Sequence, residues 1–306
     1  MLARQQRTQI HNPLRDGFTL IELLMVMAII AILAALILPA IVGAGRTARI
    51  AQVQSEMESL KTSITQFKVK FGIEPPSSIT IHERAVGTLP AMPGWSTDPL
   101  SRGLIKRLWP QFDFSYKDQL PNPGEFDFNG DGSINPVTLD GAECLVFFLG
   151  GMVDGTSGAL RGFSKNPRNP FSIDNSSRDG PFFEFIGGLD PATKSPVGRL
   201  VDANSNGLPE YVDATPSQTQ PILYFSSYGG TGYRKLDCSP RIASPYYKDA
   251  AATQAFRADG FQLISPGSDF AYGVGGLFDP EGNTFKSGDA DGDNITNFHT
   301  GTLGGF

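Results

Sequence analysis

The 306-residue sequence is poor in the side chains that most often carry catalytic chemistry. Of its three histidines, His11 lies near the N-terminus, and His82 and His299 stand alone, without the H-E-x-x-H or His-Cys spacing of a metal site. The strings G-x-S-x-G, G-x-x-x-x-G-K and G-x-G-x-x-G are also absent. We therefore expect no enzyme.

Positive charge and cysteine are scarce as well. The formal net charge is -6 at pH 7, and an acidic surface argues against non-specific binding of nucleic acid, so no nucleic-acid partner is predicted. The two cysteines, Cys144 and Cys238, lie in the part of the chain that we expect outside the cytoplasm, where a disulfide can persist. A bridge between them is the prediction, and two buried free thiols are the alternative.

The sequence has one long apolar segment instead. Every residue from Leu23 to Leu38 is apolar, and within 18–42 only Thr19, Glu22 and Pro39 interrupt the run. A helix over 18–42 would be roughly 37 Å long at about 1.5 Å per residue, which is enough to span a bilayer. No A-x-A cleavage pattern follows, so an ordinary secretory signal is disfavoured.

The flanks and the single acid of this segment are informative. Arg4, Arg7 and Arg15 outweigh Asp16 before the segment, which indicates a cytoplasmic N-terminus. A carboxylate in hydrocarbon is costly, so Glu22 implies a partner, and we expect another copy of the chain. The alternative is that Glu22 reaches the membrane surface from a one-pass anchor.

Residues 15–23, R-D-G-F-T-L-I-E-L, resemble the class III leader junction of type IV pilins and type II secretion pseudopilins. The resemblance covers about the first seventy residues. It implies that a prepilin peptidase cuts after Gly17, that the new amine of Phe18 is methylated, and that Glu22 pairs with a neighbour's N-terminal ammonium in a filament. Pro39 matches a proline of the family, and either a bend or a melting of the helix during packing would suit it.

A helical pattern continues past the apolar segment. Residues 53, 57, 60, 64, 67 and 71 are apolar and form a single stripe, and Gly72 with the following prolines ends the helix. We therefore predict a helix from about Thr19 to Phe71. The chain then divides into a leader (1–17), a transmembrane helix (18–42), an amphipathic helix (43–72) and an extracytoplasmic globular domain (73–306).

The globular part is rich in Gly, Pro, Asn and Asp, so it should be rich in loops. Strands are predicted at 222–225 and 261–265, and a short buried helix at 142–149 with Asp140 as its cap. The expected fold class is α+β, with the outer half of the long helix lying against an antiparallel sheet.

Two internal segments resemble calcium loops, in which oxygen side chains alternate around a glycine turn. The first offers Asp127, Asn129 and Asp131, and because Thr138 occupies the twelfth position, Asp140 or Glu143 would have to complete its shell. The second resembles thrombospondin-type repeats. Its candidate ligands are Asp202, Asn204, Asn206, Glu210 and Asp213. For both loops the alternative is a set of Asx turns without metal.

A third acidic segment lies near the C-terminus. Asp289, Asp291 and Asp293 repel one another unless a cation or water screens them, and an S-x-G-x-D segment places Asp269 upstream. Together the two segments resemble the C-terminal end of major pseudopilins, and that resemblance implies a calcium site. Asp269, Asp291 and Asp293 are then the leading ligands, with Asp289 next. The stretch 76–260 is much longer than in compact family members.

The sequence therefore predicts a structural subunit of a type II secretion pseudopilus. Its expected partners are other copies of itself, prepilin peptidase, other pseudopilins or pilins and the inner-membrane assembly platform. We expect an inner-membrane precursor with its globular domain outside the cytoplasm. Two alternatives stay open: a type IV pilin for adhesion, motility or DNA uptake, and an envelope-anchored binding or enzyme domain with a pilin-like N-terminus.

Overall fold

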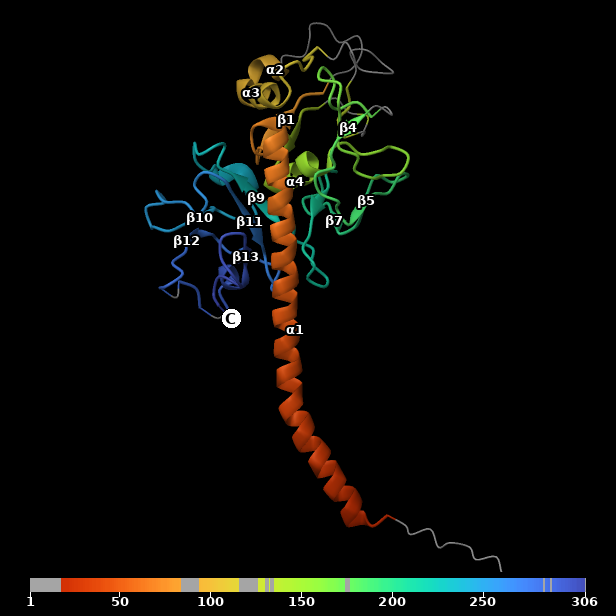
Figure 1. Ribbon diagram of the computed structural model, residues 1–306, viewed down its shortest axis with the longest axis vertical. Helices are drawn as coiled ribbons and strands as arrows, with labels where there is room; N and C mark the ends of the chain where they lie inside the picture. The colour runs from red at the N-terminus through yellow and green to blue at the C-terminus, as the bar shows by residue number, and fades with distance from the viewer. Residues whose placement is uncertain are drawn as a thin grey trace, which may run out of the picture. The chain divides into compact units, whose positions relative to one another are not determined.

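The computed structural model describes residues 18–83, 94–115, 126–129, 132, 135–173, 177–282, 284–286 and 288–305. The chain divides into two compact units between Ala48 and Arg49. Helix α1 (Leu20–Phe71) belongs partly to each unit, and the second unit holds the other described elements (Figure 1). The amphipathic half of α1 is thus part of the globular unit.

Helix α1 contains 52 residues, so the helix predicted from Thr19 to Phe71 is confirmed to within one residue. Pro39 lies inside it. In the first unit its side chains are exposed, and an 18-residue window has a mean hydropathy of 3.0. Within the described ranges, α1 is the one helix long and apolar enough to cross a membrane by length and composition. It is a candidate single-pass membrane anchor.

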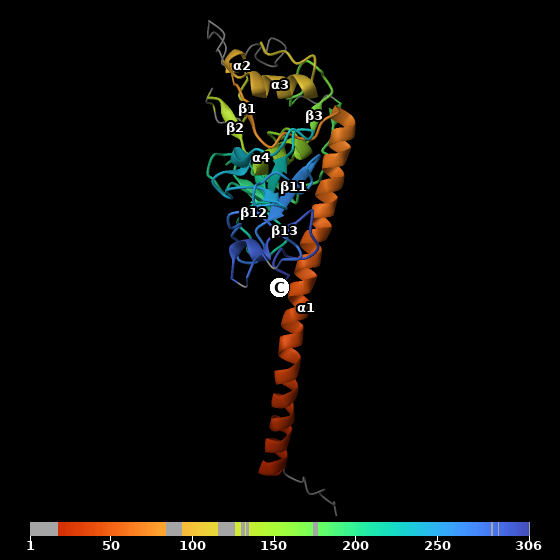
Figure 2. The same cartoon turned by 90° about the vertical axis from the view of Figure 1, so that its left-hand side faces the viewer.

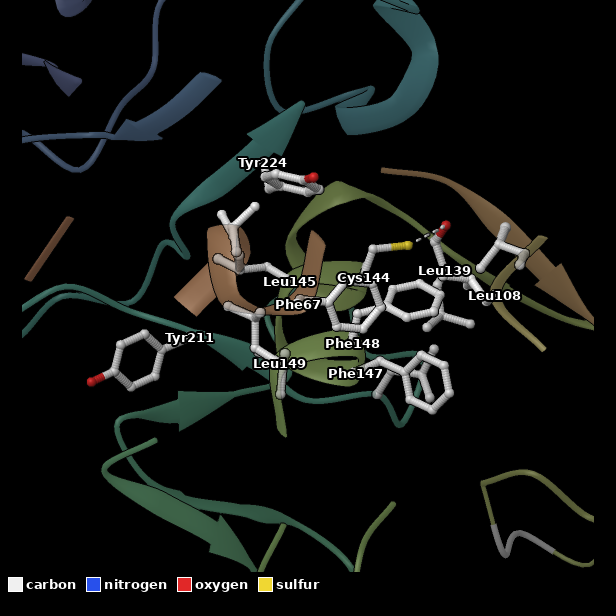
Figure 3. Close-up of a cluster of buried hydrophobic side chains, with 14 of the residues drawn as sticks. Phe67, Leu108, Leu139, Cys144, Leu145, Phe147, Phe148, Leu149, Tyr211 and Tyr224 are labelled. Carbon is white, nitrogen blue, oxygen red and sulfur yellow. Dashed lines mark hydrogen bonds between the residues drawn. The ribbon is translucent and has the colours of Figure 1, made fainter. Parts of the chain in front are cut away.

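In the second unit α1 buries one face. Its buried residues follow the helical period and include the predicted stripe from Val53 to Phe67, while Phe71 at the end is half-buried. Figure 3 shows Phe67 of α1 beside Phe148, and the two ring centroids are 5.8 Å apart in an edge-on arrangement. The apolar stripe of α1 therefore packs against side chains from the rest of the globular unit.

The partner of this face is a fully buried helix, α4 (Gly141–Gly150), which confirms the helix predicted at 142–149. Asp140 and Glu143 form a capping box at its start. A Cβ on Gly141 would lie 2.0 Å from the Tyr224 carbonyl oxygen, so only glycine lets α4 approach the neighbouring strand this closely.

That strand belongs to the central antiparallel sheet, whose order is β13-β11-β9. Strand β9 (Leu223–Ser226) pairs with β11 (Phe261–Ser265), with Leu223 opposite Ile264, and β13 (Ile295–Thr296) pairs with the other edge of β11. Both predicted strands are confirmed to within one residue. Tyr224 and Leu263 join the core that contains Phe67, so the α+β class is also confirmed.

Smaller elements surround this core. The short helices are α2 (Gly94–Thr97), α3 (Pro99–Leu108), η1 (Lys235–Cys238) and η2 (Ala290–Asp293). The antiparallel pairs are β1 (Ile79–Ile81) with β2 (Val137–Leu139), β3 (Phe163–Ser164) with β4 (Arg178–Asp179), β5 (Gly187–Leu189) with β6 (Pro196–Gly198), and β7 (Leu200–Val201) with β8 (Glu210–Tyr211). Strands β10 (Tyr246–Tyr247) and β12 (Gly276–Leu277) are parallel.

Candidate functional site

The first candidate site is the N-terminal end of α1. Phe18 is 80% exposed. Glu22 Oε2 accepts hydrogen bonds from the Thr19 amide at 2.9 Å and from the Thr19 hydroxyl at 2.7 Å, and the Glu22 amide donates back to the Thr19 Oγ1 at 3.3 Å. The acid therefore starts the helix by capping it. Gly17, the predicted cleavage residue, lies outside the described residues.

The second candidate site is the acidic C-terminal segment, whose four predicted ligands do different things. Asp291 accepts from the Tyr246 hydroxyl at 2.7 Å, the Val274 amide at 2.9 Å and the Gly275 amide at 2.7 Å. Its carboxylate therefore holds the segment after β11 to η2. Asp289 is exposed and accepts from the Lys286 amide at 2.8 Å.

Asp293 and Asp269 form a closer pair. Asp293 Oδ2 accepts from the amide and hydroxyl of Ser268 and from the Asp269 amide, at 2.6, 2.8 and 3.0 Å. Asp293 Oδ1 is buried without a hydrogen-bond partner. Burial raises the pKa of Asp269, and the neighbouring Asp293 carboxylate raises it further. Asp293 therefore presents a buried carboxylate oxygen without a hydrogen-bond donor beside the carboxyl group of Asp269.

The loop at 202–213 folds around its own backbone. Asp202 accepts from the amides of Asn206 and Gly207 at 3.0 Å each. The side-chain amides of Asn204 and Asn206 both donate hydrogen bonds to Glu143 Oε1, at 2.8 and 2.5 Å. The loop is thus tied to the start of α4, and Glu143 is the carboxylate that its two asparagines share. Asp213 turns away, because it accepts from Ser265, Thr215 and Gln218.

The loop at 127–135 begins in the same way, since Asp127 Oδ2 accepts from the Gly132 amide at 2.9 Å. Asn129 is described, whereas Asp131 lies outside the described residues. A cavity of about 430 Å³ links both loops, because Asp127, Glu143 and the 207–209 segment line it together with apolar side chains such as Phe147 and Phe171. Glu143 is therefore near both calcium-like loops.

One charged cluster was not predicted. Asp140, Glu143 and Glu210 offer oxygen atoms within 4.8 Å of one another, and the guanidinium of Arg241 binds Asp140 and Glu210. Burial raises the pKa of Glu210 to about 7 and also raises that of Glu143. Because Arg241 supplies a cation to two of its acids, the cluster reads as a buried ion-pair network. The capping box was visible in the sequence, but the pairing with Arg241 had no local signal.

The predicted disulfide is wrong in this structure, where Cys144 and Cys238 are free and buried. The thiol of Cys144 points at the Leu139 carbonyl oxygen 3.8 Å away, as Figure 3 shows, and that of Cys238 donates to the Tyr224 carbonyl at 3.3 Å. Burial raises the pKa of both thiols well above the usual value, so each stays protonated. Each cysteine acts as a small buried side chain that caps a carbonyl.

Comparison with known proteins bears on the N-terminal site. Residues 13–38 match the family model of the prokaryotic N-terminal methylation motif. The chain is 39% identical over 67 residues to the type IV major pilin protein PilE1 of Neisseria gonorrhoeae, and 41% identical over 64 residues to the type IV major pilin protein PilE of the same species. It is 28% identical over 127 residues to the type II secretion system core protein G of Pectobacterium carotovorum subsp. carotovorum.

The N-terminal region of the chain is therefore similar to that of type IV pilins and of a type II secretion system core protein. The two pilin matches cover 22% and 21% of this chain and 31% and 38% of those proteins, so the chain spans about a third of their length. The pseudopilin match covers 42% of this chain and 80% of that protein. No solved structure gives a significant match. The resemblance drawn from residues 15–23 is confirmed.

Proposed function

We propose that this chain is a structural subunit of a type II secretion pseudopilus. The observation that carries the proposal is Glu22, a carboxylate one turn into an exposed, membrane-length apolar helix that follows a prepilin-type junction. In lipid such an acid needs a counter-charge, and the amine that peptidase cleavage would create on Phe18 of a neighbour supplies one. The subunit is cut after Gly17, methylated at Phe18 and assembled through α1.

A pseudopilus is favoured over a pilus because the match to the secretion protein covers more of that relative's length. The match to the secretion core protein G extends over 80% of that protein, whereas the matches to the gonococcal pilins stop within 67 residues. A type IV pilin is the second candidate, because identity in that shorter segment reaches 41%. In either case the partners are other copies of the chain, related pilin-type subunits, prepilin peptidase and the inner-membrane platform, and the globular unit lies outside the cytoplasm.

The experiment maps the mature N-terminus after co-expression with the prepilin peptidase. We expect peptide mass spectrometry to find a chain that begins with methylated Phe18. An uncut chain, or one cut after the apolar run, would contradict the proposal. Filament formation is then scored by shearing cells that also carry a type II secretion assembly system or, in parallel, a type IV pilus system. The system that accepts the subunit separates pseudopilus from pilus.

We also propose that the C-terminal acidic segment binds a calcium ion. The support is the buried, unpartnered Asp293 Oδ1 beside Asp269, because a hard cation takes carboxylate and backbone oxygens together. Asp293 and Asp269 would hold the ion. Asp289 is a further exposed candidate, while Asp291 already has three donors. The Asp202 and Asp127 loops, with Glu143 near both, are secondary candidates.

Calcium is tested by melting the full chain in detergent with and without a chelator, together with metal analysis of the protein. We expect a lower midpoint in chelator and no such shift in an Asp293→Asn variant. Asp154→Asn is the control, since Asp154 organises an exposed turn elsewhere. An unchanged midpoint with no bound metal contradicts the calcium site and leaves the filament proposal intact.

A further inference from the structure

Helix α3 presents a basic face that forms no salt bridge with any residue that the structure describes. Ser101, Ile105 and Leu108 are its buried residues. The exposed positions include Arg102, Lys106 and Arg107. None of these three forms a salt bridge within the described part of the chain, although the Arg102 guanidinium lies over the Phe114 ring at 4.6 Å.

The acids nearest to α3 in sequence do not neutralise this face. Asp98 caps α3 through the Ser101 amide at 3.0 Å and pairs with His82 at 3.2 Å. Asp113 accepts from the Ser115 amide at 3.0 Å and lies 3.9 Å from Arg168. Both carboxylates are therefore committed to other groups, and the surface charge of α3 is positive.

The opposite charge gathers on the segment that follows β12. Asp279, Glu281 and Asp289 are exposed there, and within the described ranges none of them forms a salt bridge. Lys286 is the exposed cation between them. Figures 1 and 2 agree that α3 lies at one end of the globular unit, whereas β12 and β13 lie at the other.

We propose that the basic face of α3 docks on the acidic segment 279–289 of a second copy, as an end-to-end contact between globular units in the assembled polymer. This inference rests on the proposed function, because it needs a filament in which copies repeat. Two complementary patches at opposite ends make a heterologous contact, and such a contact extends into an open filament when its rotation does not close a ring. A self-complementary patch would give a closed dimer instead.

Charge also explains why the contact would be selective. The formal net charge of -6 makes copies repel one another over most of their surface. When the basic face of α3 on one copy faces the acidic segment of the next copy, the local interaction between the two copies is attractive. Each exposed ion pair contributes only about 0–1 kcal/mol, so the patches set register and orientation while α1 supplies the bulk of the association.

The test reverses charge at each end of the full-length chain, in cells that carry the peptidase and the assembly system. One variant is Lys106→Glu with Arg107→Glu, and the other is Asp279→Lys with Glu281→Lys. Each alone should lower the yield of sheared filament about tenfold, which corresponds to about 1.4 kcal/mol. A chain carrying all four substitutions should recover most of the yield, because its ends are complementary again.

The matched control is Lys165→Glu with Lys235→Glu, which makes the same change of net charge at exposed positions elsewhere. It should assemble like the wild type. Equal losses in the control and the α3 variant, or no recovery in the fourfold variant, would overturn the proposal. So would normal yields from both single-end variants.

Circular dichroism checks that each charge-reversed variant folds. If one does not, the milder variant Lys106→Gln with Arg107→Gln replaces it, and we expect a smaller loss of filament yield from that variant. Failure of this inference is separable from failure of the proposed function. A wild-type filament whose subunits begin at Phe18 upholds the function whatever the charge variants do, whereas absence of any wild-type filament contradicts both.

Discussion

Thr19 and Glu22 hold each other at the start of α1. The Glu22 carboxylate accepts from the amide and the hydroxyl of Thr19, and the Thr19 hydroxyl accepts from the Glu22 amide. Glu22 therefore has a local role as one half of a capping box as well as the proposed role of pairing with a neighbour's amine. The two roles have different chemical requirements, since capping needs an acceptor oxygen and pairing needs a full negative charge.

Glu22→Gln and Thr19→Val separate these roles. Glutamine keeps an oxygen that can accept from the Thr19 amide but loses the charge, so we expect normal cleavage and loss of filaments. Valine at 19 removes the cap hydroxyl and should cost about 1 kcal/mol of helix stability while leaving assembly largely intact. The measurements are the processed fraction on a gel and the yield of sheared filaments. Equal effects of the two substitutions would reduce Glu22 to a helix cap.

Arg199 joins α1 to the strands around β8. Its Nη1 and Nη2 atoms bind Glu56 Oε1 and Oε2 at 2.6 Å each, and the Tyr211 hydroxyl donates to the same carboxylate at 2.8 Å. The Glu56 and Arg199 side chains are 12% and 20% exposed. Arg199→Ala should therefore lower the free energy of unfolding by about 3 kcal/mol, because it leaves a mostly buried carboxylate without its cation.

Lys61→Ala is the control for Arg199. Lys61 pairs with Glu58 on the exposed side of α1, where the Glu58 side chain is 61% exposed. Its loss should cost no more than about 0.5 kcal/mol. Denaturant unfolding of the full chain in detergent measures both values, and similar costs for the two would refute the buried-clamp interpretation.

Cys144 and Cys238 should behave as inaccessible thiols. Because burial raises both pKa values and each sulfur lies against a carbonyl, a thiol reagent should label neither in the native protein and both after denaturation. The count is made by mass spectrometry without reductant. Detection of a bridged peptide in protein taken from the envelope would reinstate the disulfide.

Asp237 should give stability a dependence on pH. Burial raises the pKa of this carboxyl, although it accepts from Ser77 at 2.5 Å and from Tyr228 at 2.7 Å. The folded chain thus holds the proton more tightly than the unfolded chain does. The resulting stability is complete below the unfolded pKa and is lost as pH rises through the raised folded pKa, by at most about 1.4 kcal/mol per pH unit.

Asp237→Asn should remove that decline while keeping an acceptor oxygen for Ser77 and Tyr228. The melting temperature is measured from pH 3.5 to 8 in both proteins. Asp190→Asn is a comparison of opposite sign, because the Thr193 amide lowers the pKa of Asp190 and its contribution is lost as pH falls. Parallel curves for the wild type and Asp237→Asn would show that Asp237 titrates alike in both states.

The predictions that held were those with a local physical cause. Helix α1 followed from unbroken apolar sequence and then from a single stripe of helical period, and α4 followed from Asp140 at the cap of an apolar run. Strands β9 and β11 followed from short apolar runs between turn residues. Each of these signals lies within a few residues of the element that it predicts.

The sites were harder to predict, because the groups that meet are far apart in the chain. Asp213 fits the twelfth place of a loop by spacing, yet it accepts a hydrogen bond from Ser265 on β11. Glu143 serves as a capping-box acid and also as the shared acceptor of Asn204 and Asn206. Spacing identified acidic and amide side chains in turns, but it held no information on which hydrogen-bond donors the fold would bring to them.

The sequence by itself determined the prepilin-type junction, the membrane-length helix and its amphipathic continuation, because helix formation and membrane partition depend on neighbouring residues. Only the tertiary structure decided the partners of the charged and sulfur-bearing side chains. Arg241 binds two acids, both cysteines are free and buried, and Asp291 accepts a hydrogen bond from Tyr246. A buried polar group takes whatever partner packing places beside it, since leaving it unpaired costs more than any local preference.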